Sequence, residues 1–368
     1  MATLNKISLT GYKSVRDCRD LELGRLNVLI GANGSGKSNL LSLFRLLRFA
    51  MLGELQVAVG QAGGARSLLY LGPKVTTEIA ATLEFETDSE KALYECRLAY
   101  TPPGGLFFAS EKFRTTPKPG STSSPSELVV RGASESAVIQ TGFRDNERLR
   151  WFATLMAAPR SYHFHDTTLA SGIRGPRRVE EKRLYPEGEN LASVLRFLRE
   201  GHSREYSNII ETIRLVAPSF GGFILDPQPS SPDSAMLNWR MPGSDYEFGP
   251  HQISDGTLRF MALTTLLLQP KEFLPAMIVI DEPELGLHPY AIKLLASMLQ
   301  DTSNYAQILV ATQSPALVDQ MEPQDVIVAD MVEGASQFHR LDREKLSEWL
   351  SDYTLSQMWE TNLFGGRP

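Results

Sequence analysis

The chain has little cysteine, no excess of positive charge and no long apolar run. Its 368 residues include only two cysteines, Cys18 and Cys96, too few for a disulfide framework or a zinc site, so both are expected to be buried. No apolar stretch approaches the roughly 20 residues of a membrane helix, and the first residues lack the apolar core of a signal peptide. We therefore expect a cytoplasmic protein that does not enter a membrane. The net charge of −6 provides no overall positive field, so any contact with DNA must be local.

A glycine-rich loop follows directly after a short apolar run. Residues 26–30 are expected to form a buried strand, and the next eight residues, GANGSGKS, fit the phosphate-binding pattern GxxxxGK[ST]. In that pattern backbone N–H groups close around phosphate oxygens, Lys37 reaches the β and γ phosphates, and Ser38 ligates Mg²⁺. A glycine-rich turn that only caps a helix is the alternative, and the strand–loop–helix context argues against it. The residues expected to bind the nucleotide are Asn33, Gly34, Ser35, Gly36, Lys37, Ser38 and Asn39.

A second apolar run, residues 277–280, ends in the carboxylates of Asp281 and Glu282. A buried parallel strand that ends in an acid is the Walker B pattern, in which the aspartate holds the Mg²⁺ that bridges the phosphates. Because strand side chains alternate, Glu282 points elsewhere and can act as the general base for the attacking water. Alone this pattern is weak, because an apolar run before Asp-Glu usually means a strand entering a turn. Together with Lys37 it predicts a nucleotide site.

A third motif lies about twenty residues before this strand. Ser254, Asp255 and Gly256 precede an expected helix over residues 257–268. Serine and aspartate are favoured at helix starts, so Ser254 could simply be an N-cap. That interpretation explains the residue types but not their position relative to the Walker B strand.

Five segments together carry a family resemblance: GANGSGKSNLL, ISDGTLRF, IDEPELGLHP, ATQSP and LFGGRP. The chain resembles the RecF/SMC/OLD-like branch of ABC-type AAA family ATPases, and more narrowly the stand-alone bacterial ATPases related to RecF. The resemblance covers nearly the whole chain, most specifically residues 4–50 and 251–320. It implies that Ser254, Asp255 and Gly256 act in trans, as a signature motif that meets ATP held by a second copy. Residues 285–288 resemble the dimer-contacting D-loop.

The resemblance also assigns a switch position to Gln313, where the wider family usually has histidine. Glutamine cannot titrate, but it can still hydrogen-bond the γ-phosphate or the water. The catalytic residues implied are Glu282, Lys37 and Gln313, with Ser38 and Asp281 on Mg²⁺. The usual place of the Q-loop glutamine corresponds to residues 163–168, which contain no glutamine; His165 or Asp166 could line the site there or be structural. His288, before Pro289, is more typical of a helix entry than of a ligand.

The expected fold is α/β, a P-loop NTPase of ABC/SMC-head type with a mixed sheet flanked by helices. An antiparallel β subdomain and a helical lobe are inserted between the Walker A loop and the signature motif. Residues 4–30 are expected to hold two strands, and residues 59–64 a loop. The parts expected along the chain are the N-terminal half of the core (1–75), a β-rich subdomain (76–140), the Q-loop region and helical lobe (141–250), the C-terminal half of the core (251–330) and a helical tail (331–368).

Three functions remain open from the sequence. The first is a Mg²⁺-dependent ATPase that dimerises head to tail around ATP and switches a DNA- or effector-associated complex. The second is DNA binding through the basic run Arg174, Arg177 and Arg178, for which a solvated loop is the alternative. The third is an ATPase or sensor subunit of an anti-phage or toxin-type system. Because only about fifty residues follow Gln313, too few for a typical domain, a nuclease or other effector would be a separate chain.

Overall fold

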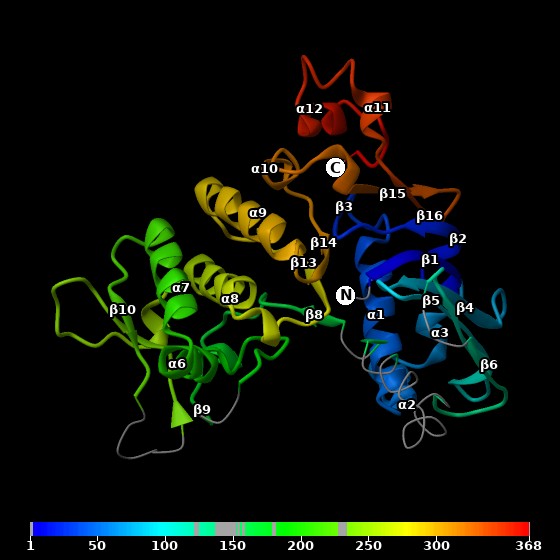
Figure 1. Cartoon of the computed structure of the whole chain (residues 1–368), viewed down its shortest axis with the longest axis horizontal. Coiled ribbons are helices and arrows are strands. Elements are labelled where there is room, and N and C mark those ends of the chain that lie inside the picture. The colour runs from blue at the N-terminus through cyan, green and yellow to red at the C-terminus, as the bar shows by residue number, and fades with distance from the viewer. Residues whose placement is uncertain are drawn as a thin grey trace.

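The computed structural model describes residues 3–120, 125–136, 152, 155–156, 159–178, 182–226 and 234–367 (Figure 1). A six-stranded sheet forms its centre. Five of its strands are parallel and the sixth, β16, is antiparallel to its neighbour. In spatial order the strands are β16 (Ala335–Arg340), β15 (Val326–Val332), β3 (Leu26–Ile30), β14 (Gln307–Ala311), β13 (Met277–Asp281) and β8 (Arg160–Tyr162).

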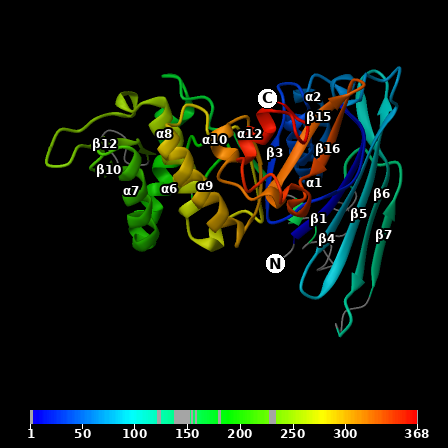
Figure 2. The ribbon, with the colours of Figure 1, turned by 90° about the horizontal axis from the view of Figure 1, so that it is seen from above.

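A second six-stranded sheet is antiparallel throughout and forms the outer layer on one side of the molecule (Figure 2). The strands from β4 onward are antiparallel as expected, but they extend a sheet that β1 and β2 begin, so it is not confined to residues 76–140. In spatial order the strands are β2 (Val15–Glu22), β1 (Thr3–Tyr12), β4 (Glu78–Glu86), β5 (Glu90–Thr101), β6 (Gly105–Pro117) and β7 (Ser126–Val130).

Helices cover the central sheet and build a lobe on the side away from the antiparallel sheet (Figure 1). The helices described are α1 (Lys37–Met51), α2 (Leu55–Gln61), α3 (Ala65–Leu68), α6 (Leu191–Gly201), α7 (Ser203–Val216), α8 (Asp255–Leu268), α9 (Pro289–Ser303), α10 (Pro315–Val318), α11 (Arg343–Leu346) and α12 (Leu355–Glu360). Short strands of the lobe are β9 (Arg177–Arg178), β10 (Gly222–Ile224), β11 (Ser234–Ala235) and β12 (Asn238–Arg240). Single 3-10 turns occupy Gly172–Arg174, Pro250–Gln252, Lys271–Phe273 and Pro323–Asp325.

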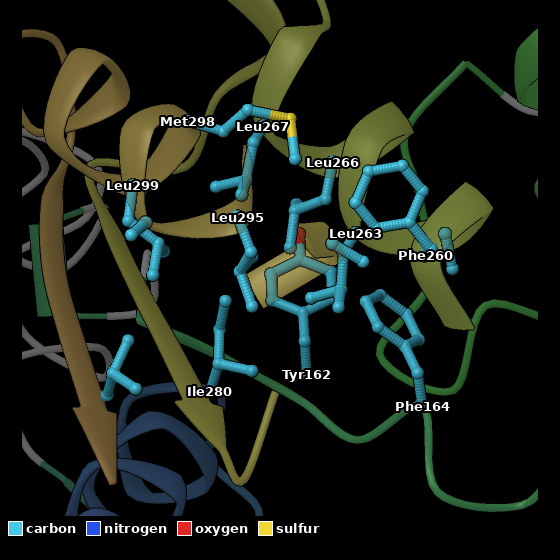
Figure 3. Packing of buried hydrophobic residues seen from close by; sticks show 14 of the residues in the cluster. Tyr162, Phe164, Phe260, Leu263, Leu266, Leu267, Ile280, Leu295, Met298 and Leu299 are labelled. Carbon is cyan, nitrogen blue, oxygen red and sulfur yellow. The ribbon is translucent and has the colours of Figure 1, made fainter. Parts of the chain in front are cut away.

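The central strands are apolar on both faces because each face meets a separate core. On one face, side chains such as Leu29 and Val279 pack with α1 and the antiparallel sheet. On the other face, Ile280 of β13 and Tyr162 of β8 lie against leucines of α8 and α9 (Figure 3). Strands buried on both sides are held firmly in register. The residues that follow β3, β13 and β14 therefore emerge at one edge, the carboxyl edge, where ligands bind in such sheets.

Three expectations for local structure were wrong. Residues 4–30 form three strands and not two. The strand β2 was not expected because exposed charged residues separate its few buried apolar positions. Residues 59–61 form the end of helix α2, so the expected loop begins only after Gln61. The segment 331–368 is not a helical tail: β15 continues to Val332, β16 follows it, and the helices α11 and α12 are short.

Candidate nucleotide site

The phosphate loop connects β3 to α1 in a conformation that requires glycine. Gly36 precedes the helix with φ of 104°, a left-handed value that side chains rarely adopt. It is also packed so tightly that a Cβ would collide with the hydroxyl of Ser336. The hydroxyl of Ser35 is buried and has no hydrogen-bond partner among the described residues. A phosphate cradled by the loop would supply the acceptor that this hydroxyl lacks.

Lys37 begins α1, and its side chain is folded back over the loop. Its Nζ donates to the carbonyl oxygens of Gly31 at 2.5 Å and Ala32 at 3.0 Å. Burial lowers the pKa of the Lys37 ammonium, while the carboxylates of Glu282 and Asp281 act in the opposite direction. The ammonium is therefore held on the loop, where it also experiences the negative charge of Glu282 and Asp281. From there it can exchange its carbonyl partners for phosphate oxygens.

Gln313, at the expected switch position, links Glu282, the residue after β13, to the phosphate loop. Glu282 leaves the strand with φ of 45°, an uncommon value for a residue with a side chain, and its N–H donates to the carbonyl of Ala311 at 2.8 Å. The Nε2 of Gln313 donates to Oε1 of Glu282 at 2.7 Å and to Oδ1 of Asn33 at 2.6 Å. The structure thus brings together three segments that lie far apart in the sequence.

The oxygen donors at this edge fit a magnesium ion. Ser38 is exposed at the start of α1, and Asp281 is the last residue of β13. In the described part of the chain, no three His, Cys, Asp or Glu side chains are grouped so that they could hold a metal by themselves. A hydroxyl and a single carboxylate, completed by phosphate oxygens and water, are what Mg²⁺ accepts in nucleotide sites. Ser38 and Asp281 would hold it here.

The segment at the Q-loop position follows β8, the neighbour of β13. His165 is turned inward, and its Nε2 donates to the backbone carbonyl of Asp281 at 2.8 Å. Asp166 instead closes a local turn by accepting from the N–H and hydroxyl of Thr168. Burial lowers the pKa of His163, partly offset by the Asp281 carboxylate. Of the two candidates named from the sequence, His165 therefore contacts the end of β13 at Asp281, whereas Asp166 is engaged in a local turn.

The signature segment caps and anchors α8. The Ser254 hydroxyl accepts from the N–H of Thr257 at 3.2 Å and donates to its hydroxyl, so Ser254 is indeed an N-cap. Gly256 touches the D-loop so closely that a Cβ would collide with the carbonyl of Gly286. The cap leaves Ser254 and Asp255 exposed, as a surface for a second subunit would require.

Arg174 is not available to DNA, contrary to the expectation from the basic run. Its side chain is 3% exposed, and its guanidinium donates to the carbonyls of Thr167, Pro250 and Ile253 and to the Asp255 carboxylate at 2.8 Å. The arginine is thus an internal brace that fixes the entry to α8. It also lowers the pKa of Asp255 through this hydrogen bond.

The other two members of the basic run differ from Arg174. Arg177 is exposed in β9 and remains available for contacts. The backbone of Arg178 pairs with Ser234 of β11.

Two sets of contacts that support the phosphate loop could not be predicted from the sequence. Behind the phosphate loop, the Ser14 hydroxyl accepts from Asn39 at 2.7 Å and from Ser336 at 2.7 Å. Gly366 packs against Gly31 and is held there by a hydrogen bond from its N–H to Asp330. The segment LFGGRP is part of the family resemblance, but its residues do not by themselves indicate this packing. The Asn39 amide, expected to bind nucleotide, is engaged with Ser14 in this structure.

The D-loop is clamped to the signature helix. Arg259 of α8 donates to the carbonyls of Leu285, Phe164 and His165, so one side chain joins the D-loop and the Q-loop segment. The sequence feature that could have indicated this role is the position of Arg259 in the first turns of an otherwise apolar helix. His288 caps α9 by accepting from the N–H of Tyr290, which confirms its interpretation as a helix entry.

Solved structures share this fold. A structure of the SmcHead bound to the C-winged helix domain of ScpA has a TM-score of 0.60 at 16% identity, covering 94% of this chain and 99% of that one. An Smc head domain from Pyrococcus furiosus, bound to the C-terminal domain of ScpA, has a TM-score of 0.59 at 16% identity, covering 96% and 99%. An Smc head domain from Pyrococcus yayanosii has a TM-score of 0.53 at 12% identity, covering 96% of this chain and 99% of that one. At these identities the likeness shows the fold alone.

Sequence comparisons provide the family. No curated protein sequence matches the chain. No helix in the described residues has the length and apolar character needed to cross a membrane. The family described as "AAA domain, putative AbiEii toxin, Type IV TA system" matches residues 26–319, most of the chain. The protein therefore belongs to this AAA family and has the fold of ABC/SMC-type ATPase heads.

Proposed function

We propose that the protein is a Mg²⁺-dependent ATPase whose two copies close head to tail around ATP. The observation that carries this proposal is the bridge made by Gln313 between Asn33 of the phosphate loop and Glu282 after β13. It places a carboxylate and an amide beside the loop that would hold the γ-phosphate. Such a pair can orient a water molecule and accept its proton.

Each group has a separate task in this reaction. The loop N–H groups and Lys37 bind the β and γ phosphates, and Glu282 takes the proton of the attacking water while Gln313 orients it. Mg²⁺, held by Ser38 and Asp281, would neutralise charge on the phosphate oxygens. Because Gln313 does not titrate, it acts as a sensor of the γ-phosphate and not as a proton carrier.

A dimer is proposed because the signature segment caps and packs within its own subunit yet still presents an exposed helix start. Ser254 and Asp255 are exposed at the N-terminus of α8, where the helix dipole favours an anion. In a head-to-tail pair this terminus would meet the γ-phosphate held by the other copy. Hydrolysis would then release the pair, or its hold on a partner.

The test combines phosphate release with measurement of molar mass. Glu282→Gln removes the base but keeps the side-chain shape, so we expect hydrolysis to fall by about 10²- to 10⁴-fold. The same variant should accumulate as an ATP-bound dimer in light scattering. Lys37→Ala should abolish ATP binding and dimerisation. Glu272→Gln, an exposed glutamate before β13, is the matched control. Hydrolysis at the wild-type rate by Glu282→Gln would show that the base assignment is wrong.

The second candidate function is an ATPase or sensor that works with a separate effector in a toxin-type or anti-phage system. The description of the matched family, with its putative AbiEii toxin, favours it. The SMC heads of similar fold that are bound to ScpA domains also support a partner protein. We expect growth arrest when the wild-type chain is expressed together with its neighbouring gene products, and none when Lys37→Ala replaces it. Equal growth of both strains, alone and with neighbouring gene products, would count against this function.

A further inference from the structure

The carboxyl group of Glu284 lies beneath the switch segment. Its Oε1 accepts hydrogen bonds from the hydroxyl of Thr312 at 2.5 Å and from the N–H of Gln313 at 3.2 Å. Its Oε2 is buried and has no hydrogen-bond partner among the described residues. Burial raises the pKa of this carboxyl group. Since a buried carboxyl group is costly to keep, a task for it is expected. The roles proposed above give it none.

The contact fixes the residue that bridges the site. Glu284 holds the backbone of Gln313, while the side chain of Gln313 reaches Glu282 and Asn33. Without that acceptor, the N–H of Gln313 and the hydroxyl of Thr312 would lose their partner. The segment would then be free to carry the Gln313 amide away from the base. A misplacement of about 1 Å is enough to cost roughly 10²-fold in rate.

Glu284 also belongs to a turn that touches the signature helix. The carbonyl of Leu285, the next residue, accepts from Arg259 at 3.0 Å. Gly286 is in van der Waals contact with Gly256 of the signature segment. The turn Glu284–Gly286 is therefore wedged between the start of α8 and the switch.

We propose that Glu284 is a positioning residue that holds Gln313 on the general base Glu282, and that its turn ties this pair to the signature segment of the same subunit. The inference rests on the proposed function. Glu284 touches neither substrate nor metal in this scheme and acts through Gln313.

Two substitutions separate positioning from direct catalysis. Glu284→Ala removes the acceptor, and we expect kcat to fall about 10- to 100-fold with the Kd for ATP within about twofold of wild type. Glu284→Gln keeps an oxygen that can accept from Thr312 and Gln313, and it should restore most of the rate. If Glu284→Gln is as slow as Glu284→Ala, the carboxylate charge acts directly and the positioning role is overturned.

A double variant tests whether Glu284 acts through Gln313. Adding Glu284→Ala to Gln313→Ala should slow hydrolysis by less than about twofold, because the residue to be positioned is already gone. Losses that multiply would overturn the proposal. Glu272→Ala, at an exposed site, is the matched control and should leave kcat unchanged.

Hydrogen exchange tests the contact between Glu284 and Gln313 without any measurement of ATP hydrolysis. Without nucleotide, the Gln313 amide should exchange faster in Glu284→Ala and at the wild-type rate in Glu284→Gln. An unchanged exchange rate of the Gln313 amide in Glu284→Ala would show that Glu284 does not hold the backbone of Gln313. If the wild-type protein and Glu282→Gln both fail to hydrolyse ATP, the proposed function fails, whereas the exchange result still decides whether Glu284 holds Gln313.

Discussion

The side-chain amide of Gln313 donates to Oε1 of Glu282 at 2.7 Å. Its second hydrogen is used as well, on Oδ1 of Asn33 at 2.6 Å. Both donors are thus engaged before any nucleotide enters. Arrival of a γ-phosphate offers the amide a charged acceptor in place of a neutral one, and charge-assisted hydrogen bonds are about twice as strong. In the proposed mechanism, the amide would therefore exchange Asn33 for a phosphate oxygen while it keeps its hydrogen bond to Glu282.

Replacing Gln313 by leucine should uncouple binding from turnover. Gln313→Leu removes the bridge but leaves the phosphate loop and Lys37 intact. We expect ATP affinity to stay within about threefold and the rate of phosphate release to fall by about 100-fold. Titration with labelled ATP and single-turnover hydrolysis measure the two quantities. Gln324→Leu, at an exposed site, is the control. A wild-type rate for Gln313→Leu would remove Gln313 from the mechanism.

Arg174→Met should destabilise the fold. The substitution removes the donor that the carbonyls of Thr167, Pro250 and Ile253 share. We therefore expect the free energy of unfolding to fall by about 3 kcal/mol. Urea denaturation measures it. Arg177→Met, at an exposed site, should change it by less than about 0.5 kcal/mol. Similar stability of the two variants would contradict the role of Arg174 as a brace.

Gly256→Ala should push the signature segment off the D-loop. The new methyl group would collide with the backbone carbonyl of Gly286, which cannot move aside as a flexible side chain could. We expect a cost of about 1–3 kcal/mol in unfolding free energy and slower hydrolysis. Gly201→Ala, in open space at the end of α6, should be neutral or slightly stabilising. If both glycine variants behave alike, the packing contact is unimportant.

The two thiols should resist alkylation in the native protein. Burial raises the pKa of Cys96 to about 12 and that of Cys18 to about 11, so the reactive thiolate is scarce at pH 8. Iodoacetamide should label both cysteines in urea and neither within the same time in native buffer. Because Cys96 is the more deeply buried, it should be the slower of the two. Rapid native labelling of Cys96 would contradict its placement within the antiparallel sheet.

The meeting of Lys37, Asp281 and Gln313 at one edge could be predicted from the sequence. Each of these residues follows a short apolar run, and parallel strands buried on both faces present their carboxyl ends together. The motifs therefore predict that these segments meet, and with them the candidate site, without any knowledge of the helical lobe.

The role of Arg174 could not be predicted, because it depends on distant backbone. Its partners Pro250 and Ile253 follow 76 and 79 residues later, and a run of arginines looks the same whether carbonyls or solvent surround it. Glu284 is similar: an acid three residues after Asp281 indicates nothing until Thr312 is placed beside it. The strand β2 was missed because its exposed charges mask the alternation of apolar residues.

The position of β3 in the central sheet has a consequence for biosynthesis. Its two neighbours are β14 and β15, and Asn27 of β3 donates to the carbonyl of Ile308, 281 residues later. While the ribosome makes the chain, this apolar strand emerges some 281 residues before the strand that pairs with it. Until then it is an unpaired edge, open to chaperones and to misassembly. Binding of nucleotide by the nascent protein would thus report that the whole core has been completed.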